Sequence, residues 1–161
     1  MKKKRKTLAV SAAGILFALC IFALQSKADA LNGIKQVTTD KDLIIPIAEI
    51  TTDASFYPVD IEGTRLEVIA VKAPDGSIRT AFNTCQVCYG SGRGYYKQQG
   101  NFLICQNCGN RFRMNQVETR SGGCNPIPIF ADNKKIVGKN IVISKEFLKK
   151  SKNIFANWNR S

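Results

Sequence analysis

Histidine is absent from the 161 residues of this sequence. Its absence excludes catalytic pairs in which histidine activates a serine or a cysteine, and it excludes a Cys-x-x-Cys-His site for covalent haem. Zinc and iron–sulfur sites that mix cysteine with histidine are excluded for the same reason. Any metal site in this chain must therefore use sulfur, carboxylate or backbone ligands.

Acidic residues are scarce, with 12 Asp and Glu against 24 Lys and Arg. Residues 31–161 alone carry 18 basic and 11 acidic residues, an excess compatible with an anionic membrane surface, an acidic partner or plain solvation. The acids of the central region are Asp53, Asp60, Glu62 and Glu67. They show no paired arrangement, so hydrolytic catalysis is not indicated. The basic residues are scattered, which argues against a nucleic-acid partner.

The N-terminus has the composition of an export signal. Residues 2–6 are basic, residues 8–24 form a seventeen-residue apolar run, and small residues at Ala28 and Ala30 suit a signal peptidase. A helix over this run would be roughly 25 Å long, so an uncleaved membrane anchor is also compatible. We therefore expect residues 1–30 to be a signal peptide or anchor and the rest to be exported across the cytoplasmic membrane. Cys20 lies within the run and is interpreted as a membrane-buried apolar residue.

The remaining chain predicts one mainly β domain of α+β type. A polar linker is expected over residues 31–42 and the folded domain over residues 43–161. Strands are expected at 43–50 (an edge strand with Pro46), 54–59, 64–72, 78–82, 95–98, 101–104, 110–117 and 136–143. A C-terminal helix capped by Ser144 is expected from the apolar spacing of Phe147, Leu148, Ile154, Phe155 and Trp158. The expected fold is a small β-meander or sandwich with a metal-binding hairpin and one C-terminal helix.

Five of the six cysteines lie between residues 85 and 124. The pairs Cys85/Cys88 and Cys105/Cys108 are separated by sixteen residues, and Gly109 follows the second pair where a turn needs positive φ. The segments at 95–98 and 101–104 read as a hairpin that carries one pair at each base. Four thiolates gathered in this way suit zinc or an iron–sulfur cluster.

Two other interpretations of the cysteines stand beside a metal site. Exported proteins usually pair cysteines as disulfides, although five cysteines would leave one unpaired, and a redox-active Cys-x-x-Cys is a further alternative. Cys124 follows two glycines and precedes Asn125-Pro126, so it lies in a loop. That loop either brings Cys124 to the metal as a fifth ligand or forms a surface turn with a spare thiol.

The sequence motifs of this chain resemble those of the membrane iron-sulfur-containing FtrD-like family over roughly residues 43–158. The matching residues are Phe56-Tyr57, the segment 75–82, Cys85-Gln86-Val87-Cys88-Tyr89, Gly94-Tyr95, Cys105-Gln106-Asn107-Cys108-Gly109, Phe112 and Gly123-Cys124-Asn125-Pro126. The order of elements is also similar to a Rieske-type domain, and the second cysteine pair to a zinc ribbon. All four pair positions are cysteine, so a Rieske cluster with its histidines is not expected.

The resemblance implies an iron–sulfur cluster at the membrane and an electron-transfer role linked to iron or other metal uptake, with a membrane protein as redox or transport partner. The expected ligands are Cys85, Cys88, Cys105 and Cys108, with Cys124 as a possible fifth. A redox carrier is expected rather than a stand-alone enzyme. The alternatives are a structural zinc site in a binding module and, third, a metal-delivery or thiol-exchange protein that uses Cys124.

Overall fold

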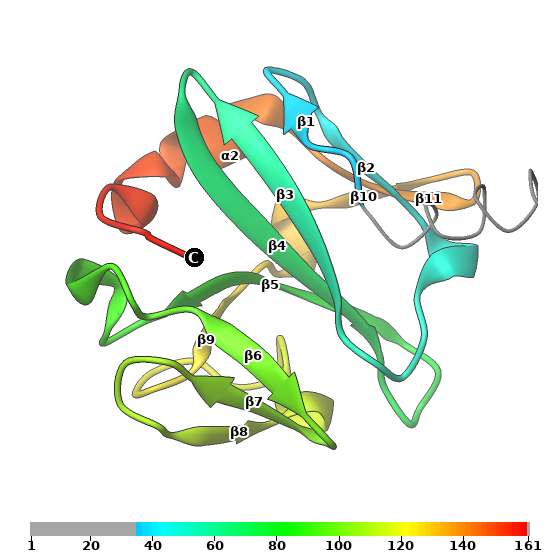
Figure 1. Cartoon of the computed structure of the whole chain (residues 1–161). Helices are drawn as coiled ribbons and strands as arrows, with labels where there is room; N and C mark the ends of the chain where they lie inside the picture. Colours follow the sequence, from blue (N-terminus) through cyan, green and yellow to red (C-terminus); the bar gives the residue numbers. More distant parts are fainter. Residues whose placement is uncertain (1–34, 161) are drawn as a thin grey trace, which may run out of the picture. The chain divides into compact units, whose positions relative to one another are not determined.

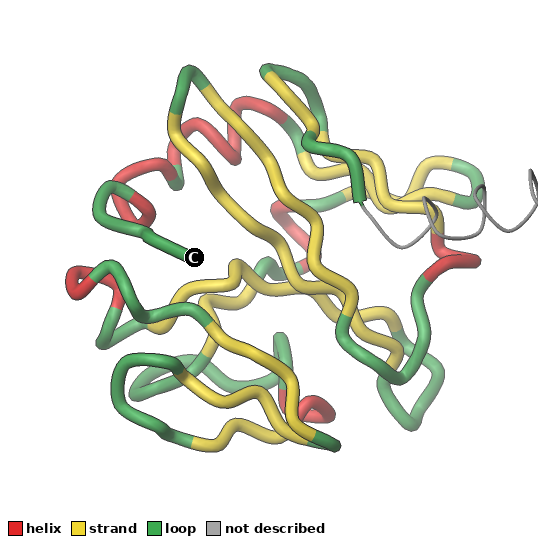
Figure 2. The backbone as a smooth tube through the Cα atoms, in the orientation of Figure 1, coloured by secondary structure: helices red, strands yellow, loops and turns green. Residues whose placement is uncertain are grey.

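The computed structural model describes residues 35–160, whose strands form three sheets (Figures 1 and 2). The strands are β1 (Thr38–Thr39), β2 (Leu43–Pro46), β3 (Ser55–Ile61), β4 (Thr64–Lys72), β5 (Ile78–Cys85), β6 (Tyr96–Gln99), β7 (Phe102–Cys105), β8 (Arg111–Arg113), β9 (Pro126–Pro128), β10 (Lys135–Val137) and β11 (Asn140–Ile143). The sheet orders are β1-β3-β4-β5-β9, β10-β11-β2 and β6-β7-β8. The mainly β prediction is confirmed.

The five-stranded sheet is buried on both faces, because its central strand β4 is apolar almost without interruption. Residues 66–71 of β4 are all buried, and their side chains alternate between two separate cores. Leu66, Val68 and Ala70 face the first core, whereas Ile69 and Val71 face the second. Strands β3, β4 and β5 are joined as an antiparallel meander, so the end of β5 is fixed relative to both cores.

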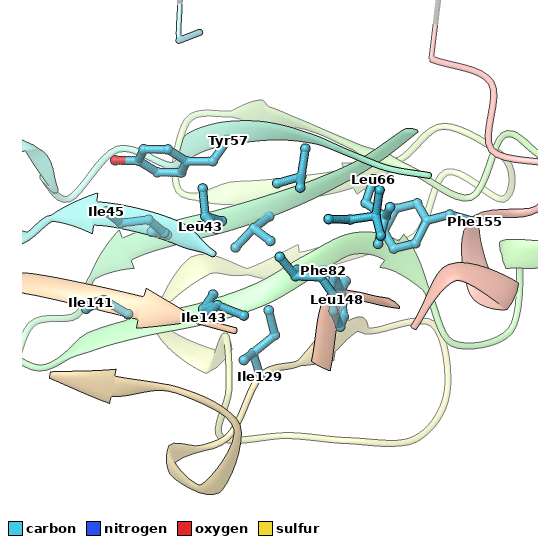
Figure 3. Packing of buried hydrophobic residues seen from close by; sticks show 14 of the residues in the cluster. Leu43, Ile45, Tyr57, Leu66, Phe82, Ile129, Ile141, Ile143, Leu148 and Phe155 are labelled. Atoms are coloured by element: carbon cyan, nitrogen blue, oxygen red, sulfur yellow. The ribbon is translucent and has the colours of Figure 1, made fainter. Parts of the chain in front are cut away.

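The first core lies between the five-stranded sheet, the β10-β11-β2 sheet and the C-terminal helix (Figure 3). Its largest fully buried members include Leu43, Ile45, Phe82, Ile141 and Leu148. Full burial of such a side chain contributes roughly 1.5–3 kcal/mol. The domain therefore has a substantial core that contains no cysteine.

The second core lies between the five-stranded sheet and the β6-β7-β8 sheet. Its buried members include Tyr96, Leu103 and Phe112 together with Cys85, Cys88 and Cys105. The inward face of each strand in the small sheet supplies one of these apolar side chains, as period-two alternation requires. Three cysteines of the two pairs, Cys85, Cys88 and Cys105, therefore belong to this core.

The C-terminal helix begins where the cap was expected and is shorter than the apolar spacing suggested. Ser144 Oγ accepts a hydrogen bond from the Phe147 N–H at 3.3 Å, and α2 (Lys145–Lys150) follows. The chain then continues as a 3₁₀ turn at Lys152–Phe155. Phe147 and Phe155 both pack on Phe82, so one apolar stripe is kept although the α-helix ends after six residues.

Three expected strands differ from the structure. The segment 136–143 is a hairpin, β10 and β11, because Gly138 adopts φ +60° and turns the chain. The segment 43–50 ends as a strand at Pro46 and becomes a 3₁₀ turn, with β2 at a sheet edge as expected. The segment 110–117 forms only the three residues of β8 before another 3₁₀ turn.

Two further expectations concern the linker and the N-terminal signal or anchor. Residues 38 and 39, in the expected linker, pair with β3 as the short parallel strand β1. The expected signal or anchor at residues 1–30 lies outside the described residues. Within residues 35–160, no helix has the length and hydropathy that a bilayer crossing requires.

Candidate metal centre

The first cysteine loop begins at the last residue of β5. Cys85 is fully buried there, and its N–H donates to the Gly94 carbonyl at 2.7 Å. The backbone N–H groups of Val87 and Cys88 donate to the Cys85 sulfur, which turns the loop around that atom. Gly94 is needed at this crossing, because a Cβ there would lie 2.7 Å from the Cys88 backbone. The loop is therefore shaped around an inward-facing sulfur.

The second cysteine loop repeats this arrangement at the end of β7. Cys105 is 1% exposed, and its sulfur accepts backbone hydrogen bonds from Asn107 and Cys108. Gly109 has φ +71°, as the sequence predicted, and its N–H donates to the Cys105 carbonyl at 2.9 Å. The second loop is joined to the residue before β6, because the Gln106 N–H donates to the Tyr95 carbonyl at 2.8 Å.

The loops bring the sulfurs together as two triads that share Cys88. In the inner triad, the sulfurs of Cys85, Cys88 and Cys105 lie within 4.8 Å of one another, and all three residues are buried. In the outer triad, the sulfurs of Cys88, Cys108 and Cys124 lie within the same distance of one another. Cys108 is exposed and Cys124 half-buried, so one side of the centre is closed and the other faces solvent.

Cys124 is thus brought to the centre, and its loop is held in that direction by the chain around it. The Cys124 sulfur lies 3.7 Å from the Cys108 sulfur. The Cys124 carbonyl accepts hydrogen bonds from the Tyr96 hydroxyl at 2.9 Å and from Asn110 Nδ2 at 3.0 Å. The Gln86 N–H also donates to the Asn125 carbonyl at 3.0 Å. The first cysteine loop and the Cys124 loop therefore support each other.

Tyr96 is a site residue that the sequence analysis did not single out. Its side chain is fully buried in the second core, and its hydroxyl also hydrogen-bonds the Cys85 sulfur. A tyrosine in a β-rich stretch is an ordinary strand residue, so sequence carried no signal for this contact. Two other tyrosines lie near the pairs in sequence: Tyr89 is 43% exposed, and Tyr95 is buried with its ring against Trp158.

The electrostatics of the thiols reflect burial and hydrogen bonding. Burial raises the pKa of Cys105 to about 12 despite its two backbone donors. Burial also opposes ionisation of Cys85, but the Tyr96 hydroxyl and two backbone N–H groups outweigh it and hold that pKa below its ordinary value. The backbone N–H of Asn110 lowers the pKa of Cys108. The hydrogen bond with Cys108 and burial raise the pKa of Cys124 to about 12.

The donor set fits a thiolate-bound metal group. All five described cysteines carry free thiols, and each belongs to at least one of the two triads, Cys88 to both. Neither triad contains a carboxylate. Sulfur donors of this kind suit iron–sulfur clusters and zinc and are poor ligands for calcium or magnesium. Arg111 and Arg113, which lie near Cys108 in sequence, instead contact the Phe102 ring.

Comparison with known proteins adds a family to this geometry. The model of the family described as "Membrane iron-sulfur containing protein FtrD-like" matches residues 50–155. No curated protein and no solved structure matches the chain. The matched range contains both triads.

Proposed function

Because the chain belongs to the FtrD-like family of membrane iron-sulfur containing proteins, we propose that it is an extracytoplasmic electron carrier that serves iron or other metal uptake. Its cofactor is an iron–sulfur cluster, as the family description states and the gathered thiols allow. We assign the ligands as Cys85, Cys88, Cys105 and Cys108, because clusters of the common types take four thiolates.

The observation that carries this proposal is the convergence of three chain segments on one set of sulfurs. The end of β5, the end of β7 and the loop before β9 each deliver cysteine to the two triads. The second core places three of these thiols side by side, and they could be ionised there only with a bound cationic group to offset their charge.

The chain's own residues hold, shield and tune the group. When bound, an iron–sulfur cluster accepts and releases single electrons. Burial of Cys85 and Cys105 excludes water from the inner side. The backbone N–H groups of both loops donate to the sulfurs, and the single Tyr96 hydroxyl proton is shared between the Cys85 sulfur and the Cys124 carbonyl, which favours the thiolate form and raises the reduction potential. The exposed Cys108 side is the route by which an electron partner approaches.

The family and the sequence support a membrane partner. The family is a membrane family, and residues 8–24 form an apolar run ahead of the described domain. A carrier held at the membrane surface would exchange electrons with a membrane protein of a metal-uptake system. The basic residues 2–6 would keep the N-terminus on the cytoplasmic side and so place the cluster outside.

Anaerobic purification of the full chain in detergent tests the proposal. We expect visible charge-transfer absorption, iron and acid-labile sulfide in comparable amounts, and an electron paramagnetic resonance signal in one redox state. Localisation is read from protease access to the domain in intact cells and in spheroplasts. A colourless protein with zinc and no iron would contradict the carrier function, and protection of the domain inside the cell would contradict the location.

Replacement of Cys124 tests the ligand assignment. Cys124→Ser keeps its full iron and sulfide content if the four pair cysteines suffice, whereas Cys105→Ser loses most of both. Cys20→Ser, outside the described residues, is the matched control for removal of a thiol. Loss of iron from Cys124→Ser to the level of Cys105→Ser would move Cys124 into the ligand set.

A further inference from the structure

The outward face of the β6-β7-β8 sheet is a small basic surface. The strand register places Lys97, Ile104 and Arg111 in one row and Gln99, Phe102 and Arg113 in the next. Their side chains point away from the second core, which receives the alternate residues of the same strands. Three of these six side chains are cationic and exposed, and none is acidic. We call these six residues the basic face.

Two of its cations are held in place by an aromatic ring. The Arg111 guanidinium lies 4.2 Å and the Arg113 guanidinium 5.2 Å from the centre of the Phe102 ring. Stacking of this kind keeps the planar groups ordered, and both arginines are exposed to solvent. Beside them, Lys97, Gln99, Ile104 and Gln106 line a shallow hollow. Ordered guanidinium groups beside a hollow form a receptor for carboxylates that requires little reorganisation.

Nothing in the surrounding segment neutralises this charge. Residues 85–125 contain Arg93, Lys97, Arg111, Arg113 and Arg120 against one acid, Glu118. Glu118 is already paired with Lys134 and accepts from the Thr80 N–H at 2.8 Å. Arg93 Nη2 donates to the Gln106 carbonyl at 3.2 Å, so the positive charge continues from the basic face to the second cysteine loop.

We propose that the basic face is the docking surface for an acidic partner protein that exchanges electrons with the cluster. The proposal rests on the electron-carrier function proposed above. β7 ends at Cys105 and β8 begins at Arg111, so the exposed Cys108 lies in the loop that joins these two strands. A partner docked on the basic face would therefore reach the sulfurs by the exposed Cys108 side. Charge complementarity would both orient the partner and speed its encounter.

A protein partner is favoured over a lipid surface because the basic face has no exposed large apolar side chain. Among the described residues, the exposed large apolar side chains are Val37, Ile44, Val87, Tyr89, Phe130, Ile136 and Val137. None of them belongs to the basic face. Interfacial membrane binding combines cations with apolar side chains that enter the bilayer, whereas this face offers guanidinium groups over a covered ring.

Binding of poly-L-glutamate to the purified holoprotein tests the face directly. In low salt we expect the parent to bind, the double variant Arg111→Gln/Arg113→Gln to bind roughly five- to tenfold more weakly, and high salt to abolish the difference. The matched control Lys135→Gln/Lys139→Gln removes two exposed cations from the β10–β11 hairpin and should bind like the parent. Equal weakening in both double variants would overturn the proposal, since net charge alone would then explain binding.

Two small oxidants test whether the face governs electron exchange. The dithionite-reduced holoprotein passes one electron to ferric EDTA, an anion, or to hexaamminecobalt(III), a cation. We expect Arg111→Gln/Arg113→Gln to slow the first reaction and accelerate the second several-fold at low salt, with little change in the control. Unchanged rates in a variant with full iron content would overturn the docking surface and leave the carrier function standing.

Failure of the carrier function and failure of the docking surface give different results. A parent protein without iron would refute the proposed function, while polyglutamate binding would still report on the face. Vesicles with 30% phosphatidylglycerol are the lipid probe. If the arginine variant loses vesicle binding and keeps polyglutamate binding, the face is a membrane contact and the protein partner is refuted.

Discussion

At the scale of single residues, Tyr96 connects two parts of the metal centre that are far apart in sequence. Its hydroxyl donates to the Cys124 carbonyl and lies in hydrogen-bonding contact with the Cys85 sulfur. Burial, followed by the surrounding sulfurs, raises the pKa of Tyr96, so the hydroxyl stays protonated and remains a donor. A neutral donor beside a ligand sulfur stabilises the more negative, reduced state of a cluster.

We therefore expect Tyr96→Phe to retain iron and to shift the midpoint potential of the cluster to a more negative value. The loss of the hydroxyl should also cost about 1 kcal/mol of stability. Potentiometric titration followed by visible absorption measures the shift. Tyr89→Phe is the control, because Tyr89 adjoins Cys88 and is exposed. An unchanged potential in Tyr96→Phe would show that the hydroxyl serves only to hold the Cys124 loop.

The sequence predicted the placement of some residues in the cysteine cluster and not of others. The two Cys-x-x-Cys pairs were predictable because thiolate spacing is local and because no histidine competes as a ligand. The direction of the Cys124 loop was not, since it depends on hydrogen bonds from Tyr96, Asn110 and Gln86 that come from other elements. Long-range contacts of this kind leave no local pattern.

At the scale of elements, the segment at residues 157–160 fastens the first cysteine loop to the body of the domain. Asn157 Nδ2 donates to the Gly90 carbonyl at 3.1 Å, and the Asn159 N–H donates to the Gly92 carbonyl at 2.8 Å. Trp158 Nε1 donates to the Asn83 carbonyl at 2.9 Å, and Arg160 pairs with buried Glu67. The loop after Cys88 is thus held from outside as well as by its own turns.

Gly92→Ala should disrupt the contacts between residues 157–160 and the first cysteine loop. A Cβ at Gly92 would lie 2.2 Å from the Asn157 carbonyl oxygen, and the residue has φ +75°. We expect a lower melting temperature and reduced iron content, measured by calorimetry and elemental analysis. Gly63→Ala is the matched control, because Gly63 has φ +74° with nothing within 4 Å and should show only the backbone cost of about 1–2 kcal/mol. Equal effects in both variants would show that the contact with Asn157 is unimportant.

The turn between β4 and β5 should give the stability of the protein a pH dependence. Asp75 accepts hydrogen bonds from the Ser77 hydroxyl and N–H and pairs with Arg79, and together these hold its pKa at about 2 instead of 3.8. A carboxylate whose pKa is depressed by folding stabilises the protein above its ordinary pKa, and this contribution is lost as pH falls through the folded value.

Asp75→Asn should therefore melt at a lower temperature than the parent at pH 7. The difference should shrink as pH falls from 3.8 towards 2, the interval between the two pKa values. Acid also releases iron from both proteins, so the difference between parent and variant is the quantity to compare at each pH. A difference that stayed constant with pH would mean that the charge of Asp75 contributes nothing.

Helix and strand positions were predictable where a single residue determines the local backbone conformation. They were less predictable where packing against other elements determines it. The cap at Ser144 and the edge position of Pro46 follow from local chemistry and were correct. The hairpin at β10–β11 was missed because apolar residues continue on both sides of Gly138 and imitate one long strand. The helix ended early because the Ser151 N–H and hydroxyl bond the carbonyls of the preceding turn.

At the scale of the whole molecule, two cores share the central strand β4, and only one of them contains cysteine. The mainly β class was predictable from the β-rich runs, and the family was predictable from the cysteine-containing motifs. The assignment of strands to three sheets was not, since β9 joins β5 and β11 joins β2 across long intervals of sequence. Such pairings depend on which apolar faces meet after collapse.

Removal of the metal should therefore loosen one side of the molecule more than the other. Chelation under oxidising conditions is expected to lower the melting temperature by more than about 5 °C. Hydrogen exchange should accelerate in β6, β7 and β8, while β3 and the β3-facing amides of β4 stay protected. Uniform acceleration across all three sheets would show that the cores do not open separately.

The contacts between residues 157–160 and the first cysteine loop also constrain the order of events during biosynthesis. Asn157 lies 67 positions beyond Gly90 in the chain. A ribosome adds residues one at a time, so the cysteine loops exist for several seconds before the segment that fastens them has been made. The cysteine loops are therefore open to a cofactor before the C-terminal segment arrives, and they become enclosed only after residues 157–160 have been made and have packed against them.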